Sequence, residues 1–338
     1  MSPTLDEVLR QPVAGVPAPV AEVLLALAGG CGDLAEAVAA RHGAHVAPNA
    51  DTGAGDVQAG IDVVADELFT GRLGQAPVRW VASEARPAAT LLDCTAPIAV
   101  AIDPLDGSAD LSTNAAVGTI FSLLRAAGGS PDATFHTAGT AQLAAGFVVY
   151  GPATTMVLTV GASVHGFVLD RSSGRWLLER AGLAIPHSTP EYAVNASNRR
   201  HWAPGLRAYI DDLVAGATGP RLADFDMRWT ATLVAEANRI LTRGGIVLYP
   251  ADDRAGYEEG RLRLLHEAFP IALIVERAGG AATDGSSRLL DRVVGDLHQR
   301  TPLVFGSADK VARVAAYHDE RFEGDRSPLF SARGLFRG

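Results

Sequence analysis

Apolar and polar residues follow patterns that predict strands and helices mixed throughout the chain. Short apolar or alternating runs bounded by Gly, Pro or Asp are typical of strands, whereas apolar residues spaced three and four apart are typical of helices. The predicted strands are 78–82, 98–102, 117–125, 142–150, 155–160, 166–170, 175–179, 246–249 and 271–276. The predicted helices are 20–41 (one or two helices around Gly29-Gly30), 56–68, 202–214, 227–242, 261–269 and 308–317. This order indicates a layered α/β fold with a mainly antiparallel second half.

The composition is that of a large folded protein with an acidic charge balance. With 338 residues, of which 48% are hydrophobic, the chain can form one large domain or two intimate ones. Its 29 Lys and Arg against 38 Asp and Glu give a net charge of −9, so it has no general attraction for nucleic acid or anionic membranes. A phosphorylated substrate would need local positive charge, from metal ions or a few Arg, because Lys310 is the only lysine.

Cysteine usage and the apolar runs predict a soluble cytoplasmic protein. Cys31 and Cys94 lie in no Cys-x-x-Cys motif or Cys/His cluster, which argues against a disulfide scaffold and a structural zinc site. The N-terminal residues lack the basic and apolar regions of a signal peptide. No uncharged apolar run approaches the roughly 18–20 residues of a membrane helix. We therefore expect neither a membrane nor a nucleic acid as partner.

The strongest chemical signal is Asp103-Pro104-Leu105-Asp106-Gly107-Ser108, which follows the apolar strand 98–102. We interpret it as a tight turn, stiffened by Pro104, that carries two carboxylates and a backbone carbonyl. Such oxygen ligands suit Mg²⁺ or Mn²⁺. If the following N–H groups open a helix or nest, they form an anion site beside the metal. The spacing alone is also compatible with an ordinary Asp-rich connection.

This hexapeptide resembles the signature of the inositol monophosphatase/fructose bisphosphatase superfamily. Longer blocks resemble class I fructose-1,6-bisphosphatase, in order, from about Asp56 to the C-terminal helix: 117–121, 144–151, 195–198, 261–267 and 296–300. The variants at 195–198, 227–229 and 256–260 resemble the bacterial Calvin-cycle-operon type. The resemblance implies the five-layer α-β-α-β-α sandwich of the sugar phosphatases, with mixed and antiparallel sheets. It implies an N-terminal domain (1–190) with the metal-binding turn and a C-terminal domain (191–338) with a sugar-phosphate cradle.

The resemblance also implies roles for individual residues. The implied ligands of two or more Mg²⁺ (or Mn²⁺) ions are Glu84, Asp103, Leu105 through its carbonyl, Asp106 and Glu267. The implied catalytic residues are Asp56, Asp62 and Glu84. Asp56 would help to orient or deprotonate the attacking water, although it also suits a helix N-cap. The implied substrate-binding residues are Asp106, Gly107, Ser108, Ala109, Asn195, Arg228, Tyr249 and Arg261. Arg228 would reach into a neighbouring subunit's site of a homo-oligomer, expected to be a tetramer.

The implied reaction is Mg²⁺-dependent hydrolysis of the 1-phosphate of fructose 1,6-bisphosphate, a step of gluconeogenesis and the Calvin cycle. Sedoheptulose 1,7-bisphosphate, alone or as a second substrate, remains an alternative because it presents the same phosphate-bearing end. Inositol monophosphate is a poorer fit because the second phosphate cradle would have no purpose. AMP-inhibited relatives carry a Thr-Gly-Glu segment near the N-terminus and a Lys-Tyr pair where Pro97-Ile98 stand here. We therefore predict weak or absent AMP inhibition.

Departures from the family pattern lie close to the implied metal site. Ala85 stands where relatives usually carry a second Glu, and Ala109-Asp110-Leu111-Ser112 replace the usual Ser-Asn-Ile-Asp. We hypothesise that Asp110 partly replaces the charge lost at Ser112, since alternation along an extended segment would put both on one face. Ala85 leaves open a second class of function, a weakened or inactive phosphatase homologue that acts in binding or assembly.

Overall fold

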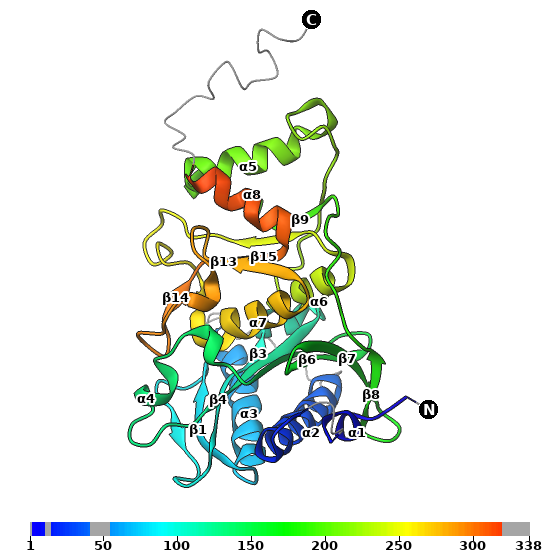
Figure 1. Cartoon of the computed structure of the whole chain (residues 1–338), viewed down its shortest axis with the longest axis vertical. Coiled ribbons are helices and arrows are strands. Elements are labelled where there is room, and N and C mark those ends of the chain that lie inside the picture. Colours follow the sequence, from blue (N-terminus) through cyan, green and yellow to red (C-terminus); the bar gives the residue numbers. More distant parts are fainter. Residues whose placement is uncertain (1, 11–14, 41–54, 320–338) are drawn as a thin grey trace, which may run out of the picture.

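Helices and sheets alternate in five layers along the long axis of the protein (Figure 1). The computed structural model describes the backbone of residues 2–10, 15–40 and 55–319, and the side chains of these residues except 55–60, 318 and 319. Three separate apolar cores fill the spaces between successive layers. The predicted α-β-α-β-α sandwich is therefore confirmed, with one mixed sheet in each half.

The first two layers are formed by the N-terminal helices and an eight-stranded sheet. The helices are α1 (Leu5–Leu9), α2 (Ala18–Ala40) and α3 (Gly55–Leu73). The sheet has the order β2-β1-β3-β4-β5-β6-β7-β8 and is antiparallel except for the parallel pair β1 and β3. Its strands are β1 (Val78–Ser83), β2 (Thr90–Leu91), β3 (Ile98–Asp106), β4 (Val117–Arg125), β5 (Ala144–Tyr150), β6 (Thr154–Val160), β7 (Ser163–Asp170) and β8 (Arg175–Arg180).

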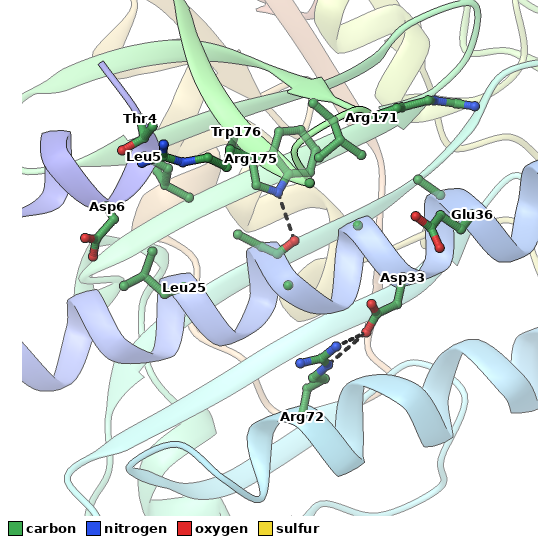
Figure 2. A pocket seen from close by; sticks show the side chains of 16 residues that line it. Thr4, Leu5, Asp6, Leu25, Asp33, Glu36, Arg72, Arg171, Arg175 and Trp176 are labelled. Atoms are coloured by element: carbon green, nitrogen blue, oxygen red, sulfur yellow. Dashed lines mark hydrogen bonds and ion pairs between the residues drawn. The ribbon is translucent and has the colours of Figure 1, made fainter. Parts of the chain in front are cut away.

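Helix α2 runs through the Gly29-Gly30 pair as one continuous helix. Gly30 is required there because a Cβ atom would lie 2.9 Å from the ring of Phe69 on α3. Figure 2 shows α2 beside a cavity of about 400 Å³, where the indole of Trp176 donates to the Ala28 carbonyl at 2.9 Å. In the described part of the chain, α2 alone is long and apolar enough to cross a membrane, and 44% of its most apolar window is buried. Its buried residues pack in the core beneath the sheet.

The remaining layers stack on the opposite face of the eight-stranded sheet. Helices α6 (Leu233–Arg243) and α7 (Phe269–Arg277) form the middle layer, packed between the two sheets. The second sheet has the order β10-β9-β11-β15-β13, with β10 (Asp226–Met227), β9 (Glu191–Val194), β11 (Ile246–Tyr249), β15 (Leu303–Ser307) and β13 (Gly280–Thr283). Helices α5 (Pro204–Val214) and α8 (Ala308–Asp319) cover its outer face.

Shorter elements connect these layers. They are the strands β12 (Leu262–Arg263) and β14 (Arg300–Thr301), the helix α4 (Asp132–Phe135), and the helical turns η2 (Ser108–Thr113), η3 (Gly139–Ala141), η4 (Ala196–His201), η5 (Gly216–Thr218), η6 (Leu264–Ala268) and η7 (Leu289–Asp291).

Three sequence predictions about the second half are wrong. The helix predicted over 261–269 is wrong at its start, because Leu262–Arg263 form strand β12 and the helical turn η6 begins at Leu264. The predicted strand 271–276 is part of helix α7. That helix is apolar on nearly every side because it lies between two sheets, so it lacks the polar stripe that identifies most helices. The helix predicted from Met227 begins only at Leu233. Met227 belongs to strand β10. Ala231 has a φ of 71°, which a right-handed helix cannot contain, so the helix can begin only after it.

Candidate active site

The first acidic positions lie where two parallel strands end together. Strands β1 and β3 pair in parallel up to Ser83 and Ile102, so Glu84 and Asp103 follow at the same edge of the sheet. The Glu84 amide continues the ladder by donating to the Ile102 carbonyl at 2.9 Å. Asp103 is 8% exposed. The fold thus brings two predicted site residues, 19 positions apart, to one place.

The segment Asp103–Asp106 is not the tight turn predicted from the sequence. Strand β3 continues through it to Asp106, and the turn follows at Gly107. Pairing with β4 is irregular between Asp103 and Asp106. The segment is therefore a bulged strand, and Leu105, the predicted carbonyl ligand, buries its side chain beneath the sheet.

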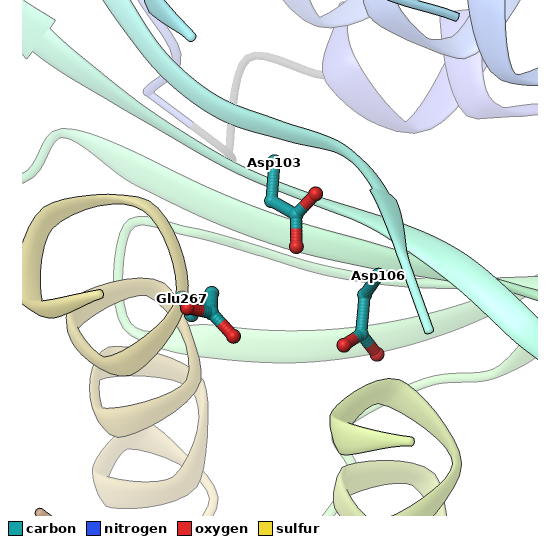
Figure 3. Close-up of side chains that lie close together, drawn as sticks. All are labelled: Asp103, Asp106 and Glu267. Carbon is teal, nitrogen blue, oxygen red and sulfur yellow. The ribbon is translucent and has the colours of Figure 1, made fainter. Parts of the chain in front are cut away.

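Asp103 and Asp106 of β3 and Glu267 of η6 converge from two elements (Figure 3). One ligand oxygen from each lies within 4.8 Å of the others. Backbone amides hold all three side chains: Leu105 donates to Asp103 at 3.1 Å, Val234 at the start of α6 donates to Asp106 at 2.9 Å, and Arg263 donates to Glu267 at 2.5 Å. These bonds fix the positions of the three carboxylates.

Burial, together with repulsion between these carboxylates, makes their ionisation costly in the absence of a cation. Burial raises the pKa of Asp103 well above its ordinary value, and the charges of Asp106, Glu267 and Glu84 act in the same direction. Burial likewise raises the pKa of Asp106 to about 6 and that of Glu267 to about 8. In the described part of the chain, no Arg or Lys side chain forms an ion pair with any of the three. A divalent cation fits this donor set, because it would balance the charge through hard oxygen ligands.

Glu84 lies beside the cluster but outside the three converging carboxylates. Its Oε1 pairs with Arg263 Nε at 3.1 Å. Its charge nevertheless raises the pKa of Asp103 and Glu267, so it lies within electrostatic reach of both. The sequence pattern assigned no role to Arg263, although it stands four residues before Glu267, a spacing that could have drawn attention to it.

The other acidic positions predicted to act in catalysis lie on α3. The Ser108 hydroxyl donates to Asp62 Oδ2 at 3.2 Å, which joins α3 to the residues after the bulge. Burial raises the pKa of Asp62, and the nearby Glu84 acts in the same direction. Asp56 falls in the first turn of α3, but its side chain lies outside the described residues.

Gly107 begins the segment predicted to bind phosphate. Its φ of 77° favours glycine, and a Cβ atom would lie 2.3 Å from the Thr232 methyl group at the start of α6. The 3₁₀ helix η2 follows from Ser108, with Ala109 exposed in its first turn. Because η2 is helical rather than extended, the argument that placed Asp110 and Ser112 on one face is wrong. Asp110 does lie close enough to Asp106 to raise its pKa.

The predicted phosphate-cradle residues share one edge of the second sheet. Strands β10, β9 and β11 are parallel neighbours, so their C-terminal ends meet at that edge. Arg228 follows β10, Asn195 follows β9, and Tyr249 ends β11. Arg228 is exposed, and its amide donates to the Tyr192 carbonyl at 2.8 Å. The Tyr249 hydroxyl donates to the Ala231 carbonyl at 2.8 Å.

Electrostatics connects this edge to the acidic cluster. Burial raises the pKa of Tyr249 well above its ordinary value, Asp106 and Glu267 act in the same direction, and Arg261 opposes them. Arg261 therefore lies within reach of the same hydroxyl. Its guanidinium stacks on the Tyr257 ring at 4.9 Å. This contact orients the Arg261 guanidinium.

The comparisons with known proteins agree along nearly the whole chain. Residues 31–181 match the family model described as "Fructose-1-6-bisphosphatase, N-terminal domain", and residues 185–319 match its C-terminal counterpart. "Fructose-1,6-bisphosphatase class 1 1" of Bradyrhizobium sp. is 54% identical over 88% of this chain and 86% of its own. "Fructose-1,6-bisphosphatase class 1" of Methylorubrum extorquens is 49% identical over 99% of this chain and 98% of its own.

Solved structures show the same architecture. The holo form of Leishmania major fructose-1,6-bisphosphatase superposes with a TM-score of 0.82 and 31% identity, covering 95% of this chain and all of that one. The T-state of the same enzyme gives a TM-score of 0.84 and 30% identity over the same shares.

Proposed function

Because this chain belongs to the fructose-1,6-bisphosphatase family, it is a sugar-bisphosphate phosphatase, and we propose where and how it hydrolyses the 1-phosphate of fructose 1,6-bisphosphate. The reaction centre is the acidic cluster of Asp103, Asp106 and Glu267. The convergence of these three carboxylates, without a basic partner among the described residues, is the observation that carries the proposal. A site that binds metal and phosphate together is what this hydrolysis requires.

The cluster holds two or more Mg²⁺ ions, or Mn²⁺ in their place, with Glu84 and the Leu105 carbonyl completing the ligand set. Bound metal ions would supply Lewis-acid stabilisation of phosphate charge and lower the pKa of water at the site. Glu84 Oε1 pairs with Arg263 Nε at 3.1 Å, which balances its charge, and Glu84 would contribute carboxylate oxygen to a bound ion.

The chain's own groups then bind and orient the reacting phosphate. The backbone amides of Gly107, Ser108 and Ala109 face the 1-phosphate, while Asp106 borders it. Asp62 accepts a hydrogen bond from Ser108 at 3.2 Å and thereby sets the orientation of that hydroxyl. Asp56 helps to orient the attacking water or to take its proton. Positioning and charge neutralisation provide most of the catalysis, with no protein nucleophile.

The second phosphate binds at the edge where the parallel strands of the C-terminal sheet end. Asn195, Tyr249 and Arg261 hold it within one subunit, and Arg228 reaches the corresponding site of a neighbouring subunit. The exposure of Arg228 leaves it available for this contact. The assembly is a homo-oligomer, expected to be a tetramer. Arg261 provides a planar, bidentate phosphate contact where many relatives carry Lys.

The two halves carry separate parts of this site. Residues 1–190 form the domain with the metal-binding segment, and residues 191–338 form the domain with the sugar-phosphate cradle. The enzyme acts in the cytoplasm, in gluconeogenesis and, as the bacterial variants at 195–198 and 227–229 suggest, in the Calvin cycle.

Phosphate release from fructose 1,6-bisphosphate and from sedoheptulose 1,7-bisphosphate, each with Mg²⁺ and with EDTA, tests the proposal. The decisive variants are Glu84→Gln and Asp103→Asn, each with Glu22→Gln as the matched control on the exposed side of α2. We expect release to require Mg²⁺, to fall at least about 100-fold in both site variants and to be unchanged in the control. Metal-independent release, or full activity in Asp103→Asn, would contradict the assigned site. If the enzyme prefers sedoheptulose 1,7-bisphosphate, that sugar replaces fructose 1,6-bisphosphate as the proposed substrate. If neither sugar releases phosphate, the result favours a role in binding or assembly.

A further inference from the structure

The acidic cluster depends on an irregularity in strand β3. Residues three apart on a regular strand point to opposite faces of the sheet, yet Asp103 and Asp106 converge. Asp103 pairs with Ile120 of β4 and Asp106 pairs with Gly118, so two residues of β3 face Thr119 alone. This extra residue is a β-bulge, which shifts the alternation by one position.

The burial pattern records the same shift. Before the bulge, Val100 and Ile102 pack in the core between the sheet and the N-terminal helices, and after it Leu105 packs there. The positions facing that core thus change from even to odd numbers. Without this change, Asp103 and Asp106 would face opposite sides of the sheet and could not share a ligand.

The bulge leaves the Pro104 carbonyl to be satisfied from outside the regular ladder. The Thr119 hydroxyl donates to it at 2.8 Å, and Thr119 is fully buried. Its neighbours Val117 and Phe121 pack in the core on the N-terminal side. By alternation, Thr119 approaches the bulge from that side, opposite the carboxylates.

A second buried hydroxyl group, that of Tyr150, sets the direction of this bond. Thr119 Oγ1 lies 2.8 Å from Tyr150 Oη. The threonine hydroxyl has one proton and uses it on Pro104, so Tyr150 must be the donor to Thr119. The Cys31 thiol of α2 lies in the same core, near both Tyr150 and Thr119. Burial raises the pKa of this thiol to about 12, so it keeps its proton.

We propose that Thr119 is a positioning residue of the metal site: its hydroxyl, oriented by Tyr150, holds the Pro104 carbonyl and thereby fixes the bulge that brings Asp103 and Asp106 together. This inference rests on the proposed function in one respect, that the acidic cluster binds divalent metal. Thr119 approaches the bulge from the face opposite the carboxylates. It acts through the backbone of β3.

The test is Mn²⁺ binding by metal-stripped, full-length protein, measured by electron paramagnetic resonance without substrate. Thr119→Val removes the donor but keeps the shape, whereas Thr119→Ser keeps the donor. Thr159→Val is the matched control, because Thr159 is also fully buried on a strand and its hydroxyl also donates to a carbonyl, that of Ser163, at 2.9 Å. Thermal unfolding in EDTA measures the stability of each variant.

We expect Thr119→Val to weaken Mn²⁺ binding about tenfold and Tyr150→Phe about threefold, as the loss of buried hydrogen bonds implies. Thr119→Ser should stay within about twofold of the original protein. Thr159→Val should lose stability but retain its Mn²⁺ affinity, which separates positioning from general destabilisation.

Equal Mn²⁺ affinity in Thr119→Val, Thr159→Val and the original protein would overturn the inference and leave the proposed function intact. Absence of Mn²⁺ binding in the original protein would overturn the metal site itself. If Thr119→Val fails to fold, the comparison of Tyr150→Phe with Thr159→Val decides the question, and unchanged Mn²⁺ affinity in Tyr150→Phe overturns the inference.

Discussion

Replacement of Glu267 by Gln should stabilise the metal-free protein while removing its metal site. The Glu267 carboxyl accepts the Arg263 amide at 2.5 Å, and a Gln carbonyl can accept the same bond. Burial raises the pKa of Glu267 from its ordinary 4.5 to about 8, with Asp106 and Glu84 acting in the same direction. The substitution removes this ionisation cost and preserves the shape of the side chain.

The sign and size of the effect follow from proton linkage. Between pH 4.5 and about 8 the folded protein keeps the Glu267 proton while the unfolded chain has lost it. The group therefore lowers the free energy of unfolding as pH rises through this range, and its contribution is constant below and above it. At about 1.4 kcal/mol per pH unit the full cost is roughly 5 kcal/mol. Because Glu267 titrates together with its acidic neighbours, we expect the substitution to recover roughly half of this cost in the free energy of unfolding.

Thermal unfolding in EDTA at pH 4.5, 7 and 8.5 measures the effect. Glu267→Gln should match the original protein at pH 4.5 and exceed its Tm by about 5 °C at pH 8.5, since 1 kcal/mol corresponds to about 2 °C in a chain of this size. Added Mg²⁺ should raise the Tm of the original protein and leave that of the variant unchanged. Glu22→Gln, on an exposed part of α2, should show neither effect. A uniform loss of stability at all three pH values would refute the reasoning.

Two further substitutions and one assay with AMP test other predictions. Gly107→Ala should lower the free energy of unfolding, measured by urea titration, by at least about 2 kcal/mol and should abolish activity. The backbone of Gly107 is left-handed, and an added Cβ would lie 2.3 Å from the Thr232 methyl group. Unchanged stability would contradict this packing. Tyr257→Leu should raise KM about threefold with little change in kcat, because Arg261 loses the ring that orients it at 4.9 Å; a loss confined to kcat would contradict that role. AMP up to millimolar concentration should leave the rate unchanged in a phosphate-release assay, and sub-millimolar inhibition would refute the prediction drawn from Pro97-Ile98.

Elements with a clear period could be predicted from the sequence. The strands 117–125 and 246–249 were predicted with the bounds that the structure has. The failures arise where tertiary context replaces the periodic signal. Helix α7 lies between two sheets and is buried on almost every side, so its residues read as a strand. At Met227, pairing with Tyr192 of β9 outweighs the helical pattern that continues beyond it.

The acidic positions could be identified from the motif and its resemblance, but their surroundings could not. Nothing near Glu84 in the sequence indicates its ion pair with Arg263, which is 179 residues away. Likewise, the amide that holds Asp106 comes from Val234, 128 residues further along the chain. Such contacts are set by the packing of layers and leave no local periodic trace.

The Asp103–Asp106 segment shows why its spacing was misinterpreted. Two ligands three residues apart violate the period of two of the strand that carries them, so a turn was the natural local interpretation. In the structure the segment remains a strand, and a bulge shifts by one position which residues face each side of the sheet. That solution requires a donor for the displaced carbonyl, and Thr119 supplies it from the facing strand. The functional unit therefore includes Thr119 as well as the hexapeptide, because the carboxylates can share a cation only while the bulge is held.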